Sequence, residues 1–290
     1  MKYYTDQDTL YLRGSFRAAS TGINGGIRPV TSIFNHSVPH EWTHAEPPKE
    51  LALVAAGAGL SSDYFGLLTA VDMKHLCVLQ YDFVMVFVTA GVSTPDPAGP
   101  GTINIIVYSR EGMTDGALLE TIITATEAKA EALRSMGFSL NGTITDAVVI
   151  CFEGEACHEY AGTLTELGRR VYEAIRFGVV EALKRHRGEI VREKPSFFVY
   201  SRFGGEHWAE WLPDNCAYYP CHFEGQACDF CYCPFYPCGD AALGEPMTSS
   251  TNGIVWNCSR CTLLHKPEVA SYLKHHPEAT LTELKHVEKN

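Results

Sequence analysis

The stretch HLCVLQYDFVMVFVTAGV, residues 75–92, decides the kind of fold. It is the most apolar run in the chain, but Gln80 and Asp82 interrupt it. It is too short to cross a bilayer comfortably, since a membrane helix needs about 20 apolar residues. Short Val-rich runs bounded by turn residues are typical of buried strands. The stretch therefore predicts two buried strands around a turn and no membrane segment.

Further apolar runs on both sides of this stretch extend the predicted sheet, and two long segments have helical periodicity. One of these helices opens with Thr163 and Glu166, the pattern of a capping box. Strands combined with helices that have one apolar face predict a layered, mixed α/β domain. We expect a hairpin at residues 9–20, strands at residues 64–71, 102–109 and 146–153, and helices at residues 50–60, 115–137 and 163–186.

Length, charge and cysteine distribution define the organisation of the chain. The 290 residues favour two domains, and the net charge of −11 argues against a nucleic-acid partner. Three cysteines are scattered before residue 200, whereas eight lie between Cys216 and Cys261. A charged stretch at residues 185–196 separates the two parts, so we place the boundary between residues 195 and 196. The polar, acidic start of the chain does not have the character of a signal peptide, which predicts a cytoplasmic protein.

A lysine lies on the apolar side of the predicted helix at residues 115–137. With a step of about 100° per residue from Leu118, Lys129 falls at about 20° and Thr126 at about 80°, inside the apolar sector. Glu127 falls at about 180°, outside it. A lysine that points into a core must be neutral, paired or next to a cavity. The alternative is a snorkelling lysine whose amine reaches water.

Two turns carry polar residues and glycines. Asn24, Gly25 and Gly26 follow the first predicted strands, where a hairpin turn is the favoured interpretation and a loop that approaches a ligand is the alternative. Thr143, Thr145 and Asp146 precede a predicted strand, where a turn is the default and a polar site at the strand end is the alternative. We find no nucleophile elbow, HExxH motif or obvious catalytic triad.

Seven short motifs occur in one order: NGG, GLLTAVD, VTAGVS, GTINIIV, TATEAKAEAL, GTITDAVV and AGTLTELGR. Together they resemble the adenosylcobinamide amidohydrolase family, from about residue 21 to residue 187. The resemblance implies hydrolysis of one amide in adenosylcobinamide, which releases aminopropanol and leaves adenosylcobyric acid for cobalamin synthesis. The corrinoid is thus the expected substrate rather than a cofactor. A non-enzymatic protein that binds or senses corrinoids is the alternative.

Hydrolysis of an inert amide needs an activated nucleophile and a stabilised oxyanion. Lys129 can supply the positive charge or act as a base, and Glu127 can act as a base on water, although the two point about 160° apart on an ideal helix. Asn104 and Asp146 are the other catalytic candidates. The substrate-binding candidates are Asn24, Gly25, Gly26, Thr126, Thr143 and Thr145.

The segment from residue 196 to residue 265 resembles a cysteine-rich small domain found beside corrinoid-salvage proteins, which implies contact with other salvage enzymes. Residues 199–215 depart from the pattern by lengthening its first loop. The C-x2-C-x-C and C-x2-C-x3-H spacings are close to those of zinc knuckles and ribbons. Because the segment lacks long apolar runs, we expect two structural zinc ions, with an iron–sulfur cluster less favoured. The ten candidate ligands are Cys216, Cys221, His222, Cys228, Cys231, Cys233, Cys238, Cys258, Cys261 and His265.

Overall fold

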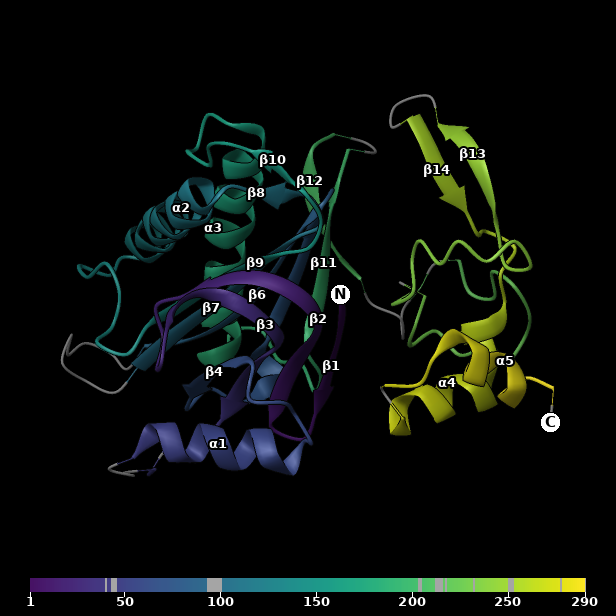
Figure 1. The fold of residues 1–290 in the computed structure, drawn as a ribbon, viewed down its shortest axis with the longest axis horizontal. Helices are drawn as coiled ribbons and strands as arrows, with labels where there is room; N and C mark the ends of the chain where they lie inside the picture. Colours follow the sequence, from purple (N-terminus) through teal and green to yellow (C-terminus); the bar gives the residue numbers. More distant parts are fainter. Residues whose placement is uncertain are drawn as a thin grey trace. The chain divides into compact units, whose positions relative to one another are not determined.

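The chain folds into two compact units, of which the first ends at Trp211 and the second begins at Leu212. Each unit is described by itself below, and Figure 1 draws both. The structure is a computed structural model that describes residues 1–39, 41–42, 46–92, 101–202, 205–211, 216, 218–231, 233–249, 253–276 and 278–289.

The first unit is built on one mixed sheet with the strand order β12-β11-β5-β6-β7-β9-β2-β3-β4, and β1 pairs with β2. Runs of Val, Ile and Phe form its centre because both faces of these strands are covered. Asp82, with a φ of 53°, makes the tight turn between the strands of residues 75–92, as predicted. The strands are β1 (Lys2–Asp6), β2 (Thr9–Ser20), β3 (Gly26–Ser37), β4 (Tyr64–Thr69), β5 (Cys77–Tyr81), β6 (Val84–Val92), β7 (Gly101–Ser109), β9 (Ala147–Phe152), β11 (Ser196–Ser201) and β12 (His207–Trp211).

Three helices pack on this sheet, and a short pair of parallel strands lies outside it. Helices α2 (Asp115–Ser135) and α3 (Glu166–His186) cover one face of the central strands, and α1 (Pro47–Gly57) lies beside β4 (Figure 1). The outer pair consists of β8 (Gly112–Met113) and β10 (Ala156–His158). The predicted mixed α/β class is confirmed. In the described part of the chain, no helix has the length and apolarity needed to cross a membrane.

Two sequence interpretations of local structure need correction. Residues 9–20 form the single strand β2, which pairs with β3 to make the hairpin. Helix α3 is capped by Thr165, whose hydroxyl accepts a hydrogen bond from the Gly168 N–H, rather than by Thr163. The same hydroxyl donates to the Gly162 carbonyl, and this turn fixes the start of the helix two residues later than the capping-box pattern indicates.

The buried face of α2 combines small residues with Leu118 and Leu133, whereas two other large aliphatic residues of the helix are exposed. Leu119 and Ile123 are 49% and 58% exposed, whereas Ala125, Ala128 and Ala132 are fully buried. Alanines allow a helix to approach its neighbours closely, and α2 packs against both the sheet and α3. The apolar sector is therefore rotated from the predicted one, but Lys129 still lies inside it.

Strands β7 and β9 run parallel, with Asn104 opposite Ala147 and Ser109 opposite Phe152. We call the side where these two strands begin the amino edge and the side where they end the carboxyl edge. Helices α2 and α3 each start near the carboxyl edge and run back towards the amino edge, as crossover connections between parallel strands must. The two edges carry different sets of polar side chains.

The first unit extends past the break at residue 195. Strand β11 pairs in parallel with β5, and β12 pairs with β11, so residues 196–211 complete the main sheet. The stretch expected to lengthen a loop of the small domain thus supplies part of β11 and all of β12. The charge and proline content before residue 196 correctly predict a turn there. They do not show which sheet the strands after this turn will join.

The second unit combines a small apolar core with the cysteine-rich segment. Its hairpin consists of β13 (Glu245–Ser249) and β14 (Gly253–Asn257). Helices α4 (Pro267–His275) and α5 (Leu281–Val287) follow, and α5 begins with a capping box between Thr280 and Glu283. Six residues form the buried core: Leu263, Leu264, Val269, Leu273, Ala279 and Leu284.

Candidate functional site

Lys129 forms a buried ion pair at the amino edge of the sheet. Its Nζ lies 2.6 Å from Oδ2 of Asp146, and the two side chains are 8% and 7% exposed. Asp146 immediately precedes β9 and projects from the sheet towards α2. Of the two possibilities open for Lys129, the buried and paired lysine is the one observed.

The carboxylate of Asp146 accepts four hydrogen bonds. Its Oδ1 receives the Ile103 N–H at 2.8 Å and the Thr143 hydroxyl at 2.5 Å. Its Oδ2 receives the Thr143 N–H at 2.9 Å in addition to Lys129. A carboxylate with both oxygens filled is poorly placed to accept a proton from water. This arrangement joins β7, the 142–146 turn and α2, which favours a positioning role for Asp146.

Close backbone packing holds this network in place. A Cβ on Gly142 would lie 2.4 Å from Asp146 Oδ2 and 2.6 Å from Lys129 Nζ, so any larger residue here would force the ion pair to shift. The Thr145 hydroxyl donates to the Gly101 carbonyl at 2.8 Å, and the Thr143 hydroxyl oxygen lies 2.8 Å from the same carbonyl oxygen. These contacts attach the turn to the first residue of β7.

The glycine-rich turn at residues 21–26 lies beside the start of β9. The Thr21 N–H donates to the Val148 carbonyl at 3.0 Å. Asn24 has a φ of 54° and Gly26 a φ of 120°, values that a tight hairpin turn between β2 and β3 requires. The hairpin interpretation is thus the one observed, and the turn sits at the same edge as Asp146.

Two of the other candidates, Thr126 and Glu127, lie away from the Lys129–Asp146 pair. Thr126 and Glu127 are exposed, and the Thr126 hydroxyl donates to the Ile122 carbonyl within its own helix. Both line an open groove of about 860 Å³ on the outer side of α2 and α3. Thr126 was expected in the apolar sector; the rotation of the buried face towards the alanines places it in solvent.

Asn104 belongs to a polar cluster on the opposite face of the sheet. Its Nδ2 donates to Asn35 Oδ1 at 2.9 Å and to the Leu68 carbonyl at 2.8 Å. Asn35 in turn donates to the Thr89 hydroxyl at 2.9 Å. All three polar side chains are at most 2% exposed, and Asn104 Oδ1 has no partner among the described residues. Asn104 and Lys129 therefore lie on opposite faces of the sheet and do not contact the same group of a substrate.

The eight clustered cysteines fall into two groups of four. Burial raises the pKa of the Cys231 thiol to about 11, and nearby thiolates add to the rise: Cys221, Cys228 and Cys216. Burial likewise raises the pKa of the Cys233 thiol to about 11, with a further contribution from Cys261, Cys258 and Cys238. Each group offers four sulfur donors, the number that a tetrahedral structural zinc site uses. The donor chemistry therefore fits two metal ions.

Gln226 supports the first group, and the two candidate histidines lie together. The Gln226 Nε2 lies 3.2 Å from Cys221 Sγ and 3.3 Å from Cys228 Sγ, where it can donate to thiolates. The rings of His222 and His265 are 4.4 Å apart, and His265 Nδ1 is 2.9 Å from the Ala227 carbonyl. Both histidines thus have contacts within the fold, and neither contact requires the histidine to bind a metal ion.

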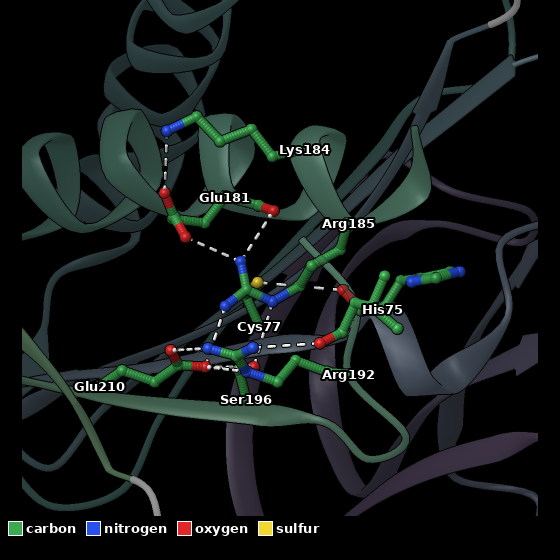
Figure 2. Close-up of polar contacts among 9 residues, drawn as sticks. His75, Cys77, Glu181, Lys184, Arg185, Arg192, Ser196 and Glu210 are labelled. Carbon is green, nitrogen blue, oxygen red and sulfur yellow. Dashed lines mark hydrogen bonds and ion pairs between the residues drawn. The ribbon is translucent and has the colours of Figure 1, made fainter. Parts of the chain in front are cut away.

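Sequence reasoning missed a buried charge cluster that attaches β11 and β12 to α3 (Figure 2). Arg185 is 1% exposed, and its guanidinium bonds to Glu181 at 2.7 Å and Glu210 at 3.0 Å. Its Nε donates to the Ser196 hydroxyl at 3.0 Å. Burial raises the pKa of neighbouring Cys77 to about 12, so this thiol is inert. The cluster explains why the strands after residue 195 belong to the first unit.

Comparison with known proteins assigns both parts of the chain. Residues 3–190 match the family described as adenosylcobinamide amidohydrolase, and residues 207–288 match the cysteine-rich small domain. The chain is 39% identical over 203 residues to the adenosylcobinamide amidohydrolase of Methanosarcina mazei, covering 65% of this chain and 100% of that protein. It is 34% identical over 188 residues to the Halobacterium salinarum protein of the same name, covering 58% of this chain and 80% of that protein.

The second unit has a different relative. A probable cobalt-factor III C(17)-methyltransferase of Methanothermobacter thermautotrophicus is 46% identical over 61 residues, which cover 21% of this chain and 17% of that protein. Because the first match spans most of the first unit and the whole of a relative, this chain belongs to the adenosylcobinamide amidohydrolase family.

Proposed function

We propose that this chain hydrolyses the amide that joins aminopropanol to the corrin side chain of adenosylcobinamide, leaving adenosylcobyric acid for cobalamin synthesis. The observation that carries the proposal is the 39% identity along the full length of the Methanosarcina mazei amidohydrolase. The cysteine-rich small domain at residues 207–288 lies outside residues 3–190, which match the amidohydrolase family. The hydrolytic chemistry therefore belongs to the first unit.

We place the substrate at the amino edge. The 142–146 turn, the glycine-rich turn and the Lys129 ammonium are brought together there from three distant parts of the sequence. Lys129 has three N–H donors, of which Asp146 takes one. A preorganised positive charge of this kind stabilises the anion that forms when an amide carbonyl is attacked. In this proposal, Asp146, Thr143 and Gly142 act as positioning residues for Lys129.

The decisive experiment is incubation of the full chain with adenosylcobinamide, followed by mass spectrometry. We expect aminopropanol and adenosylcobyric acid to appear in equal amounts. Binding of the corrinoid without either product would favour a binding or sensing protein. Cobyric acid amides that lack the aminopropanol group serve as the control, since the proposed reaction leaves them intact.

For the second unit we propose two structural zinc ions, each held by one group of four cysteines. Zinc suits a closed tetrahedral thiolate site, whereas the two spacings differ from those of common ferredoxins. The 46% identity to part of a methyltransferase supports a shared role in contacting other corrinoid enzymes. A reducing, cytoplasmic setting would keep the eight thiols available for metal. Elemental mass spectrometry separates zinc from iron.

A further inference from the structure

A second group of metal-ligand side chains lies at the carboxyl edge, far along the sheet from Lys129. Glu111, Cys157 and His158 place one ligand atom each within 4.8 Å of one another. Among the described residues this is the one set of three so close together; the eight clustered cysteines do not provide another. Residue spacing does not predict this set, because Glu111 lies more than 40 residues from Cys157 and His158.

The backbone brings Cys157 and His158 to the same place. Strand β10 pairs in parallel with β8, with Ala156 opposite Gly112 and His158 opposite Met113. Cys157 is thus an extra residue in β10, a bulge that breaks the usual alternation of side chains. Neighbouring residues of a regular strand point to opposite faces, whereas a bulge can turn both to one side.

The strands approach each other too closely for any residue but glycine at position 112. A Cβ on Gly112 would lie 2.1 Å from the Glu155 carbonyl oxygen. The Cys157 thiol is 3.2 Å from the Gly112 carbonyl, to which it donates. This close pairing fixes the position of the sulfur relative to Glu111, the residue before Gly112.

The other two side chains are held in place as well. His158 Nε2 lies 2.7 Å from Glu111 Oε2, and the His158 ring stacks on Phe83 with centroids 5.4 Å apart at 16°. The Ser109 hydroxyl donates to the Glu111 carbonyl at 2.6 Å and accepts from the Glu111 N–H at 3.1 Å. Two of the three ligand atoms, His158 Nε2 and Glu111 Oε2, are therefore already in contact. Phe83 and Ser109, in or next to strands of the main sheet, hold these two residues in place.

We propose that Glu111, Cys157 and His158 form a binding site for one divalent transition-metal ion of the zinc class. A thiolate, an imidazole and a carboxylate are a mixed set that suits zinc better than magnesium or calcium, which prefer oxygen ligands. Three protein ligands leave one tetrahedral position for water or a ligand group, whereas each of the two sites proposed for the clustered cysteines would use four protein ligands. The proposal is independent of the reaction proposed above.

The test counts zinc ions on the full chain at equilibrium with a fixed micromolar concentration of free zinc. The wild-type protein is compared with Cys157→Ser and Glu111→Gln, neither of which alters the eight clustered cysteines. The matched control is Glu155→Gln, which removes an exposed carboxylate outside the set. Circular dichroism and thermal melting in a chelator check that all four proteins fold alike.

We expect Cys157→Ser and Glu111→Gln each to bind one ion fewer than the wild type and the Glu155→Gln control. Cobalt in place of zinc gives a second readout, because Cys157→Ser lowers the sulfur-to-cobalt absorption by the share of one thiolate while the eight clustered thiolates keep theirs. Equal ion counts in all four proteins would overturn the proposal. Loss of the ion in Glu155→Gln as well would overturn the assignment of these three ligands.

Discussion

Replacing Lys129 with methionine is the sharpest perturbation of the amino edge, because it keeps the length of the side chain and removes the charge. The Lys129–Asp146 pair is 2.6 Å long, and both side chains are less than 10% exposed. Removing one partner of a buried ion pair typically costs about 3–5 kcal/mol. Asp146 retains three other hydrogen bonds, so we expect about 3 kcal/mol. For a unit of this size, that corresponds to a fall in Tm of about 6–12 °C.

The assay is thermal unfolding combined with a double-mutant cycle that adds Asp146→Asn. We expect the double variant to be more stable than the sum of the single losses predicts, by about 1–3 kcal/mol, since removing both charges leaves neither unpaired. Glu127→Ala, on the exposed side of the same helix, should change the free energy of unfolding by less than about 0.5 kcal/mol. Strict additivity of Lys129→Met and Asp146→Asn would refute the energetic account of the pair.

Activity is then measured at a temperature where Lys129→Met remains folded. The proposed role in stabilising the oxyanion predicts that adenosylcobinamide hydrolysis is lost in the folded variant. Full hydrolysis by a destabilised but folded variant would refute the catalytic role and leave Lys129 as a structural residue. The two readouts thus separate folding from chemistry.

Three further perturbations test other parts of the structure. Gly142→Ala should cost about 1–3 kcal/mol in the free energy of unfolding, because its Cβ would lie 2.4 Å from a carboxylate oxygen; an unchanged denaturant midpoint would contradict this. Burial alone would raise the pKa of Glu210, but hydrogen bonds from Arg192 and Ser196 and the charge of Arg185 lower it overall. The stabilisation is therefore present above the unfolded pKa of about 4.3 and is lost as pH falls through the folded value, so the stability difference from Glu210→Gln, measured by denaturant titration, should shrink in acid. Chelation of metal should unfold the second unit and leave the first folded, which circular dichroism and limited proteolysis can follow.

The sequence predicted the central strands well because their period and composition depend on local burial alone. It located α2 but misjudged its buried face, since Leu119 and Ile123 outweigh alanines in any hydrophobic average. Close packing against α3 and the sheet buries Ala125 and Ala132, which lie at one edge of the predicted sector, and leaves the opposite edge exposed. Lys129 was identified because a charged residue inside the apolar sector is conspicuous under either orientation of the helix.

The candidate site could be predicted only in part, because strand register decides which side chains meet. Asp146 was one of several polar residues before a strand, and only pairing of β7 with β9 brings the Ile103 N–H to its carboxylate. Asn104 was chosen from the neighbouring strand, but alternation along β7 puts it on the opposite face. Residue spacing does not single out Glu111 and Cys157, because a bulge in β10 cannot be recognised from the spacing of residues along the chain.

The two edges of the sheet raise the question of where the amide is cut. In open α/β sheets, ligands usually bind at the carboxyl ends of parallel strands, which here is the edge with Glu111, Cys157 and His158. This sheet is mixed, however, and the β2–β3 hairpin adds its glycine-rich turn at the amino edge, beside Asp146. The Lys129 ammonium and the glycine-rich turn therefore lie where the general rule expects no ligand. If the amino edge carries the reaction, Lys129→Met abolishes hydrolysis without changing the zinc count, and Cys157→Ser lowers the zinc count without abolishing hydrolysis. If instead Cys157→Ser lowers both the zinc count and hydrolysis while Lys129→Met retains both, the reaction lies at the carboxyl edge, where Glu111, Cys157 and His158 would hold the metal.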